Sequence, residues 1–211
     1  MAVFDIDYTL YDNPDYNKVG DQREIEAVAE ILGISTAEVQ ARQAITREEI
    51  VRAGRIPMKT ETILALGITQ GHFNELRVKV WNGLPRRYFC KDSVLCDVFE
   101  KLGQRYTVVF GTNSPQVIGE QIVRAVGLKT LLPRAVVFGA DSFPDAVKPA
   151  PQFFRRILDH VMVNAYQAVG IGDRAHVDVL PAIAAGFSGG FEVSGPSELP
   201  EVITQLLHAV R

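Results

Sequence analysis

The sequence predicts an α/β protein that combines a doubly wound parallel sheet with one all-helical insertion. Two patterns predict this class. From Lys91 onward, helical stretches and short apolar strands alternate along the chain, as they do when helices connect parallel strands. Between Asn13 and about Tyr88, in contrast, apolar residues recur only at helical spacing. A strand at the start of the chain precedes this helical segment, so the segment interrupts the α/β pattern after its first strand.

The helical segment contains clear helix start and stop signals. Its first helix, in DQREIEAVAEILG, places apolar residues on one face and ends before Gly33. Ser35 and Glu38 have the spacing of a capping box for a second helix, which extends to about Gly54. Two shorter helices follow, in KTETILALG and TQGHFNELRVKVW. Together these helices predict a small bundle.

The remaining elements complete a Rossmann-like core. Right-handed crossovers place the carboxyl ends of its strands at one edge of the sheet, where such folds bind ligands. We predict a catalytic core of residues 1–13 and 89–211 and a helical cap of residues 14–88 that sits over this edge. The core helices are expected at residues 91–102, 115–126, 150–161, 177–185 and 197–209, and its later strands at 106–111, 134–138, 167–171 and 187–193.

Length and composition agree with a small enzyme. The chain has 211 residues, of which 47% are apolar, and a formal net charge of -3. Because Lys and Arg are dispersed, we expect no nucleic-acid partner. The uncharged stretches, such as residues 106–119 and 179–191, are too short to cross a bilayer, so we expect neither a membrane partner nor a secretory signal. Cys90 and Cys96 read as buried residues of one helix and suggest neither a disulfide nor a zinc site, which favours a cytoplasmic location.

Two carboxylates at the end of the first strand are the most informative local feature. Asp5 and Asp7 stand two residues apart in FDIDYTLYDN, where the strand loosens into a turn. One carboxylate can attack a substrate there while its neighbour handles protons. An Asp-rich turn after an edge strand would give the same pattern, so this segment alone leaves both interpretations open.

Three later segments also carry polar residues where strands are expected to end. Each has an ordinary structural interpretation, as a helix cap, a solvated lysine or a charge in the first turn of a helix. Their occurrence in sequence order after apolar runs favours one shared site. The residues are Thr112 and Asn113 in YTVVFGTNS, Lys148 in AVKP, and Asp173 and Asp178 in AVGIGDRAHVD.

In order and spacing, the four segments resemble the signature of the haloacid dehalogenase-like hydrolase superfamily. The stretch GDRAHVDVLPAIAAGF is particularly similar to the fourth motif of that family. The resemblance implies that Asp5 is a nucleophile and Asp7 a general acid/base, with Mg²⁺ as cofactor. The further roles that it implies are phosphate binding by Thr112, Asn113 and Lys148, with Lys148 neutralising charge, and magnesium binding by Asp5, the backbone carbonyl of Asp7, and Asp173 with support from Asp178.

The chemistry of phosphoryl transfer explains why these residue types are needed. A carboxylate is a weak nucleophile toward an anionic ester, and Mg²⁺ together with Lys148 would offset the repulsion. Attack by Asp5 gives an aspartyl phosphate, which water then hydrolyses. We therefore predict a Mg²⁺-dependent phosphatase of a small organic phosphomonoester. The identity of the ester and the oligomeric state remain open.

Three alternatives use the same core. A 2-haloacid dehalogenase also has an Asp nucleophile under a helical cap, but it needs neither a proton from Asp7 nor a metal at Asp173. A sugar-phosphate mutase needs the same residues as a phosphatase. A catalytically silent binding or regulatory module is the alternative outside the enzymes, and it is disfavoured because a scaffold has no need for a nucleophile, an acid, a lysine and metal ligands.

Selectivity is expected to come from the cap, which would exclude water and contact the leaving group. Tyr8 stands where many members of the family have Gly, and we interpret Tyr8 and Tyr11 as packing residues. The basic residues that could reach an anionic leaving group are Arg52, Arg55, Lys59, Arg86 and Arg87.

Overall fold

The computed structural model describes residues 1–143 and 145–209, which form two units. The core unit comprises residues 1–14 and 83–211, and the helical unit comprises residues 15–82. The helical unit contains only helices and connecting turns, and it follows the first strand in the sequence. An α/β core with an all-helical insertion is therefore confirmed as the fold class.

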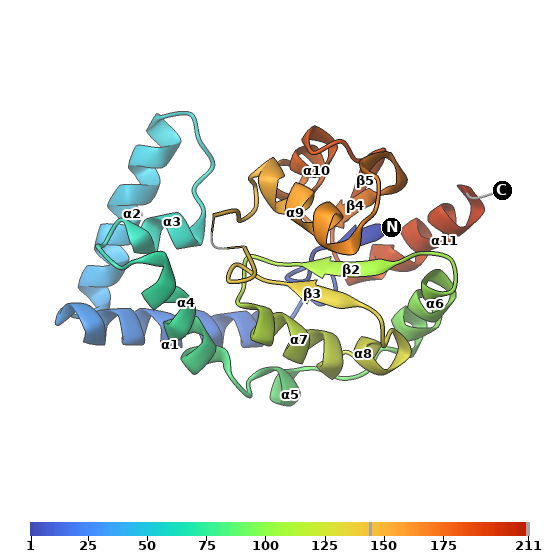
Figure 1. Cartoon of the computed structure of the whole chain (residues 1–211). Helices are drawn as coiled ribbons and strands as arrows, with labels where there is room; N and C mark the ends of the chain where they lie inside the picture. The colour runs from blue at the N-terminus through green and yellow to red at the C-terminus, as the bar shows by residue number, and fades with distance from the viewer. Residues whose placement is uncertain (144, 210–211) are drawn as a thin grey trace. The chain divides into compact units, whose positions relative to one another are not determined.

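Five parallel strands form the sheet of the core unit, in the order β3-β2-β1-β4-β5 (Figure 1). The central strand β1 pairs Phe4 with Phe110 of β2 on one side and with Ile171 of β4 on the other. This register aligns the carboxyl ends of the three strands, so the residues that follow them emerge side by side. The strands are β1 (Ala2–Phe4), β2 (Val108–Gly111), β3 (Val136–Phe138), β4 (Val169–Gly172) and β5 (Gly189–Glu192).

Helices cover both faces of this sheet, with α9 and α10 on one face and α7 and α8 on the other (Figure 1). Val3 and Val109 share the core cluster of one face with Phe153 of α9. Phe4 points to the opposite face, where its ring centroid lies 4.8 Å from that of Phe99 in α6. Burial on both faces explains why β1 and β2 are apolar, whereas the edge strand β5 is only partly buried and ends at Glu192. The helical elements of the core unit are α5 (Pro85–Tyr88), α6 (Ser93–Gly103), α7 (Gln116–Ala125), α8 (Leu128–Leu131), α9 (Pro151–Val161), η1 (Ala165–Gln167), η2 (Ala175–Val179), α10 (Leu180–Ala184), η3 (Pro196–Glu198) and α11 (Leu199–Ala209).

The core unit differs from the sequence-based prediction in the bounds of several elements, in two further short helices, α5 and α8, and in the two details that follow. The helix expected at 177–185 begins as a separate π-helical turn, η2, before it continues as α10. Cys90 is exposed and lies outside a helix, whereas Cys96 is buried in α6. The prediction that both cysteines are buried in one helix is therefore wrong for Cys90.

The helices of the helical unit begin and end largely as expected. The Oγ atom of Ser35 accepts a hydrogen bond from the Glu38 amide at 3.1 Å. Gly33, which follows α1, has a φ of 64°, a left-handed conformation that favours glycine after a helix. The helices are α1 (Pro14–Leu32), α2 (Thr36–Arg52), α3 (Lys59–Leu64) and α4 (Gln70–Trp81).

A buried carboxylate joins three of these helices. Glu24 of α1 is fully buried and forms ion pairs with Lys59 of α3 and, at 2.9 Å, with Arg77 of α4. The indole Nε1 of Trp81 donates a further hydrogen bond to Glu24 at 2.5 Å. Burial alone would raise the pKa of Glu24, but Arg77 and Lys59 together lower it, so the charged form is stabilised by folding.

Glu24→Gln should destabilise the helical unit by about 2 kcal/mol, because it removes the buried anion that Arg77 and Lys59 share. Trp81 is the single tryptophan of the chain, so its fluorescence during urea unfolding reports on this unit. The matched control is Glu26→Gln, which changes an exposed residue of the same helix. Because folding lowers the pKa of Glu24, its contribution is present above the ordinary value of 4.5 and is lost as the pH falls through the folded value. Equal unfolding midpoints for the two variants at neutral pH would contradict this role.

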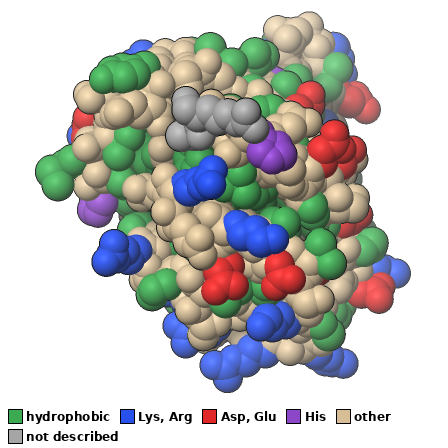
Figure 2. Space-filling model, turned by 90° about the vertical axis from the view of Figure 1, so that its right-hand side faces the viewer, with side chains coloured by type: hydrophobic (Ala, Val, Ile, Leu, Met, Phe, Trp, Pro, Cys, Tyr) green, Lys and Arg blue, Asp and Glu red, His purple; other side chains and the backbone are tan. Residues whose placement is uncertain are grey.

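The surface carries charges of both signs. On the face shown in Figure 2, Lys and Arg side chains are interspersed with acidic and hydrophobic ones and do not merge into one basic patch. In the described part of the chain, no helix has both the length and the apolar composition needed to cross a membrane.

Candidate active site

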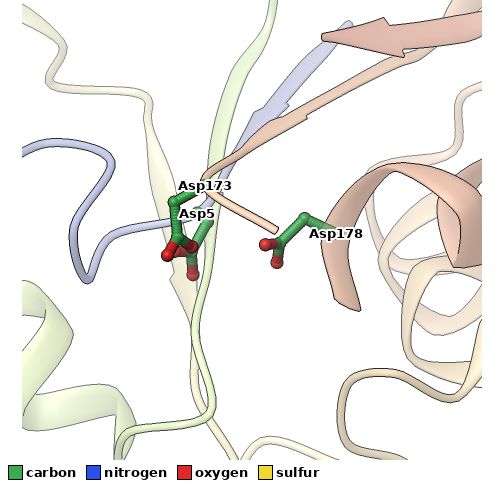
Figure 3. Close-up of side chains that lie close together, drawn as sticks. All are labelled: Asp5, Asp173 and Asp178. Atoms are coloured by element: carbon green, nitrogen blue, oxygen red, sulfur yellow. The ribbon is translucent and has the colours of Figure 1, made fainter. Parts of the chain in front are cut away.

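Residues from three strands converge at the carboxyl edge of the sheet. Asp5 follows β1, Thr112 follows β2 and Asp173 follows β4. The Asp5 amide donates a hydrogen bond to the carbonyl of Ile171 at 2.8 Å, which fixes Asp5 beside the end of β4. Figure 3 shows Asp5, Asp173 and Asp178 facing one another, and each offers an oxygen within 4.8 Å of the other two. The expected convergence of carboxylates from separate strands is therefore present.

Lys148 lies between two of these carboxylates. Its Nζ atom is 2.5 Å from Oδ1 of Asp5 and 2.6 Å from Oδ1 of Asp178, and all three side chains are buried. Burial alone would lower the pKa of Lys148, but Asp178 and Asp5 raise it above the ordinary value. Lys148 is therefore a fixed positive charge at neutral pH, next to the predicted nucleophile.

Asn113 holds the backbone of Lys148. Its Oδ1 atom accepts a hydrogen bond from the Lys148 amide at 2.9 Å, and its Nδ2 atom donates one to the Lys148 carbonyl at 2.8 Å. The sequence suggested Asn113 as a phosphate-binding residue. In the structure its amide group positions the segment that carries the lysine, and phosphate binding by Asn113 stays a prediction.

Asp178 reaches the site from the π-helical turn η2. Its Oδ2 atom accepts a hydrogen bond from the Arg174 amide at 3.3 Å, while its Oδ1 atom contacts Lys148. Gly172 makes this approach possible, because a Cβ atom at that position would lie 2.4 Å from Cβ of Asp178. A larger residue at the end of β4 would displace Asp178 and with it one partner of the lysine.

The acidic cluster has the features of a divalent-cation site. Oδ1 of Asp173 is buried and accepts no hydrogen bond from the described residues, and its ion-pair partner Arg174 lies 3.6 Å away. Burial raises the pKa of Asp173 against the effect of Arg174. Burial likewise raises the pKa of Asp5 well above its usual range, although Lys148 acts in the opposite direction. Closely spaced carboxylate oxygens that are hard to ionise together suit a small hard cation such as Mg²⁺.

Asp7 has different surroundings, which consist of hydroxyl groups. Its Oδ1 atom accepts a hydrogen bond from the Tyr11 hydroxyl at 2.5 Å. Its Oδ2 atom accepts hydrogen bonds from Oγ1 of Thr112 at 2.9 Å and from Oγ of Ser114 at 3.2 Å. Hydroxyls can donate to a carboxylate and accept from a carboxylic acid, so this environment accommodates both protonation states of Asp7. Asp5, in contrast, contacts the ammonium group of Lys148 and accepts from only one hydroxyl among the described hydrogen bonds, that of Thr9 at 3.3 Å.

Tyr11 and Ser114 also belong to the site, although the sequence did not predict them there. Tyr11 is buried and packs edge-on against Phe89, with 4.6 Å between the ring centroids, so its packing role is correct but incomplete. Ser114 is buried two residues after Thr112, and its amide donates to the Thr112 hydroxyl at 2.9 Å. Their hydroxyls near predicted strand ends are the signal that could have identified them.

Tyr8, which directly follows Asp7, has an unusual backbone conformation. Its φ is 62°, in the left-handed region that glycine adopts at lowest cost. This conformation explains why a glycine is suitable at this position. Tyr8 is also 46% exposed, so its side chain is not part of the buried core.

A family model identifies the class of protein that this fold and site define. The model for haloacid dehalogenase-like hydrolases matches residues 1–186. The chain therefore belongs to this family, as the four motifs indicated. No match was found among curated proteins.

Solved structures with the same fold include several kinds of enzyme. A haloacid dehalogenase phosphatase from Thermococcus onnurineus is 19% identical, with a TM-score of 0.61 and coverage of 96% of each chain. The hydrolase YfnB from Bacillus subtilis, bound to magnesium, is 17% identical, with a TM-score of 0.58 and coverage of 96% of this chain and 97% of that one. A 2-haloacid dehalogenase from Pseudomonas syringae is 20% identical, with a TM-score of 0.55 and coverage of 97% and 98%. Because the fold is shared by these different enzymes, the reaction must be inferred from the site.

Proposed function

We propose that this hydrolase is a Mg²⁺-dependent phosphatase that acts on a small organic phosphomonoester. The observation that carries the proposal is the pairing of two different environments at one sheet edge. Asp5 belongs to an acidic cluster that fits a cation, and Asp7 is held among hydroxyls two residues away. Such a site has both a nucleophile next to positive charge and a separate proton donor.

In the proposed mechanism, Asp5 attacks the phosphorus atom and forms an aspartyl phosphate. Mg²⁺, held by Asp5, Asp173 and the backbone carbonyl of Asp7 with Asp178 in support, would supply positive charge that offsets repulsion between the carboxylates and the phosphate. Lys148 provides a second fixed positive charge, and the Thr112 hydroxyl, which donates to Asp7 in this structure, would donate to a phosphate oxygen instead when the ester binds. Asp7 protonates the departing alkoxide and later removes a proton from the water that hydrolyses the aspartyl phosphate.

Asp7 favours a phosphatase over a 2-haloacid dehalogenase. Halide leaves without a proton, so a dehalogenase gains nothing from a carboxyl group that is held by three hydroxyls next to the nucleophile. The acidic cluster points in the same direction, because an uncharged carbon centre does not need a cation to accept a carboxylate nucleophile. A sugar-phosphate mutase would use the same residues, and a test for transfer to a sugar hydroxyl distinguishes it from a phosphatase.

We further propose that the helical unit acts as the cap that selects the leaving group. Three of its basic candidates already have acidic partners within the unit, since Arg52 pairs with Glu48, Arg55 with Glu61, and Lys59 with Glu24 and Asp21. Exposed pairs of this kind exchange partners at little cost, so Arg52 and Arg55 remain available to an anionic substrate. A panel of sugar phosphates, nucleotides and phosphoglycolate, assayed with Mg²⁺, tests the substrate class.

Removal of metal should abolish hydrolysis of the best substrate in this panel. EDTA removes the charge that allows Asp5 to approach a phosphate dianion, and added Mg²⁺ should restore activity. Asp173→Ala should raise the Mg²⁺ concentration that gives half-maximal activity by at least about tenfold, because it deletes one of a few carboxylate ligands. Mg²⁺-dependent protection against thermal unfolding should shift in parallel, which gives a second measure of binding.

The control for this experiment is Asp97→Ala, which removes an exposed carboxylate from α6 in the same unit. Its Mg²⁺ dependence should match that of the unaltered chain. Full hydrolysis in EDTA would overturn the proposed function. Release of halide from a 2-haloacid without added metal would instead identify the chain as a dehalogenase.

A further inference from the structure

Tyr11 holds one oxygen of Asp7 from a position that is fixed by packing. A turn brings the backbone of Tyr11 back beside that of Asp7, and the two residues form an isolated β-bridge. The hydroxyl of Tyr11 donates to Oδ1 of Asp7 at 2.5 Å. Its ring packs against Phe89, which lies on the segment that returns from the helical unit to the core. The hydroxyl is therefore anchored by a second segment as well as by its own turn.

The two oxygens of Asp7 have separate sets of partners. Oδ1 is contacted by Tyr11, whereas Oδ2 is contacted by Thr112 and Ser114 at the end of β2. Thr112 is also the hydroxyl proposed to bind phosphate. A phosphate that accepts the Thr112 hydrogen bond would replace Oδ2 as its acceptor, and the hydrogen bond from Tyr11 to Oδ1 would stay in place. Oδ2 is thus the oxygen on the side of the phosphate, and Oδ1 is the oxygen by which the carboxyl group is held.

We propose that Tyr11 is a positioning residue for the reaction, which orients Asp7 so that Oδ2 exchanges protons with the leaving oxygen and with water. This inference rests on the proposed phosphatase function. Tyr11 itself gains and loses no proton in the reaction. It restricts rotation of the Asp7 side chain, and proton transfer is efficient only within a narrow range of distance and direction.

Tyr11→Phe provides a direct test, because it deletes only the hydroxyl and keeps the ring against Phe89. For an alkyl phosphomonoester, whose leaving oxygen needs a proton, kcat/KM should fall by about ten- to a hundredfold. For p-nitrophenyl phosphate, kcat/KM should stay within about twofold of the value for the unaltered chain. This constant reports on the steps up to release of p-nitrophenolate, which leaves without a proton. A general loss of structure would lower both values equally, so the ratio of the two values identifies a positioning role.

Tyr106→Phe is the matched control. The hydroxyl of Tyr106 donates to the backbone carbonyl of Leu206 at 3.0 Å. Tyr106 precedes β2, whereas Asp7 follows the parallel strand β1, so the two residues belong to opposite edges of the sheet. This variant also loses one partly buried hydrogen bond, but both kcat/KM values should keep the ratio of the unaltered chain. A double variant, Tyr11→Phe with Asp7→Asn, should be no slower on the alkyl ester than Asp7→Asn alone, since Tyr11 acts through Asp7.

Two results would overturn the inference while leaving the phosphatase function intact. One is an equal loss of kcat/KM on both esters in Tyr11→Phe. The other is a double variant that shows the full loss from Tyr11→Phe in addition to that from Asp7→Asn. Failure of the proposed function would give a different result, because the unaltered chain would then hydrolyse neither ester with Mg²⁺. That result would overturn both the phosphatase function and the positioning role of Tyr11.

Discussion

Asp5→Asn should lower turnover of phosphomonoesters by at least about 10⁴-fold. An amide is not a nucleophile toward phosphorus and is a poor ligand for Mg²⁺, so the substitution removes two functions of one side chain. The loss should appear with alkyl and aryl esters alike, because every substrate requires the attack. We expect the variant to fold, since Asn has nearly the same shape and Lys148 keeps Asp178 as a partner at 2.6 Å.

Initial rates and intact-mass spectrometry together check this prediction. The unaltered chain should show a phosphoryl adduct when it is quenched in acid during turnover, and Asp5→Asn should show none. Asp97→Asn, at an exposed position on α6, makes the same chemical change away from the site and should keep both the rate and the adduct. Turnover by Asp5→Asn within about tenfold of the unaltered rate would place the nucleophile at another residue.

The sequence predicted the fold well because its local signals agreed with one another. Apolar runs marked strands such as β1 and β2, and Gly33 and Ser35 marked a helix end and a helix start. Strand lengths were less predictable. The second strand was expected from residue 106, yet β2 begins at Val108 because its partner β1 begins at Ala2, and Ala2 pairs with Val108. The length of a strand depends on its neighbour in the sheet, which a single apolar run does not reveal.

Candidate site residues could be predicted from the sequence where a residue type suited to the chemistry stood at the end of an expected strand. Asp5, Thr112 and Asp173 follow three neighbouring strands, so topology alone brings them together. The hydrogen bonds from Asn113 to the backbone of Lys148 could not be predicted, because they join residues that are 35 positions apart. Tyr11 was ambiguous for another reason. An aromatic ring predicts packing, and only the structure reveals that the hydroxyl at its end meets Asp7.

The ammonium group of Lys148 is shared by two carboxylates of the acidic cluster, one of which is the predicted nucleophile Asp5. Lys148 contacts Asp5 and Asp178, while Asp173 has an oxygen without a hydrogen bond from the described residues. One positive charge is thus distributed over two of three nearby carboxylates. A divalent cation at Asp173 would neutralise the remaining negative charge. We therefore expect removal of the metal and substitution of Asp5 to affect the same chemical step, the attack on phosphorus.

Asp7→Asn should separate the two halves of the proposed reaction. For an alkyl phosphate, both the departure of the leaving oxygen and the attack of water need proton transfer, so turnover should fall by about 10²- to 10⁴-fold. With p-nitrophenyl phosphate, the first half should proceed, because nitrophenolate is stable without a proton. The second half still lacks its base. Phosphate should therefore accumulate on Asp5 as the aspartyl phosphate.

A rapid-mixing experiment with this aryl ester measures the accumulation. We expect a burst of p-nitrophenolate that approaches one equivalent of enzyme, followed by slow turnover, and an adduct that peptide mapping locates at Asp5. Asp97→Asn should show the burst amplitude and steady rate of the unaltered chain. The isosteric Asn can still accept a hydrogen bond from Tyr11, so any loss arises from the missing acid and base and not from a collapse of the site. Undiminished steady turnover in Asp7→Asn would mean that another group transfers the protons, and an adduct on a residue other than Asp5 would exclude Asp5 as the nucleophile.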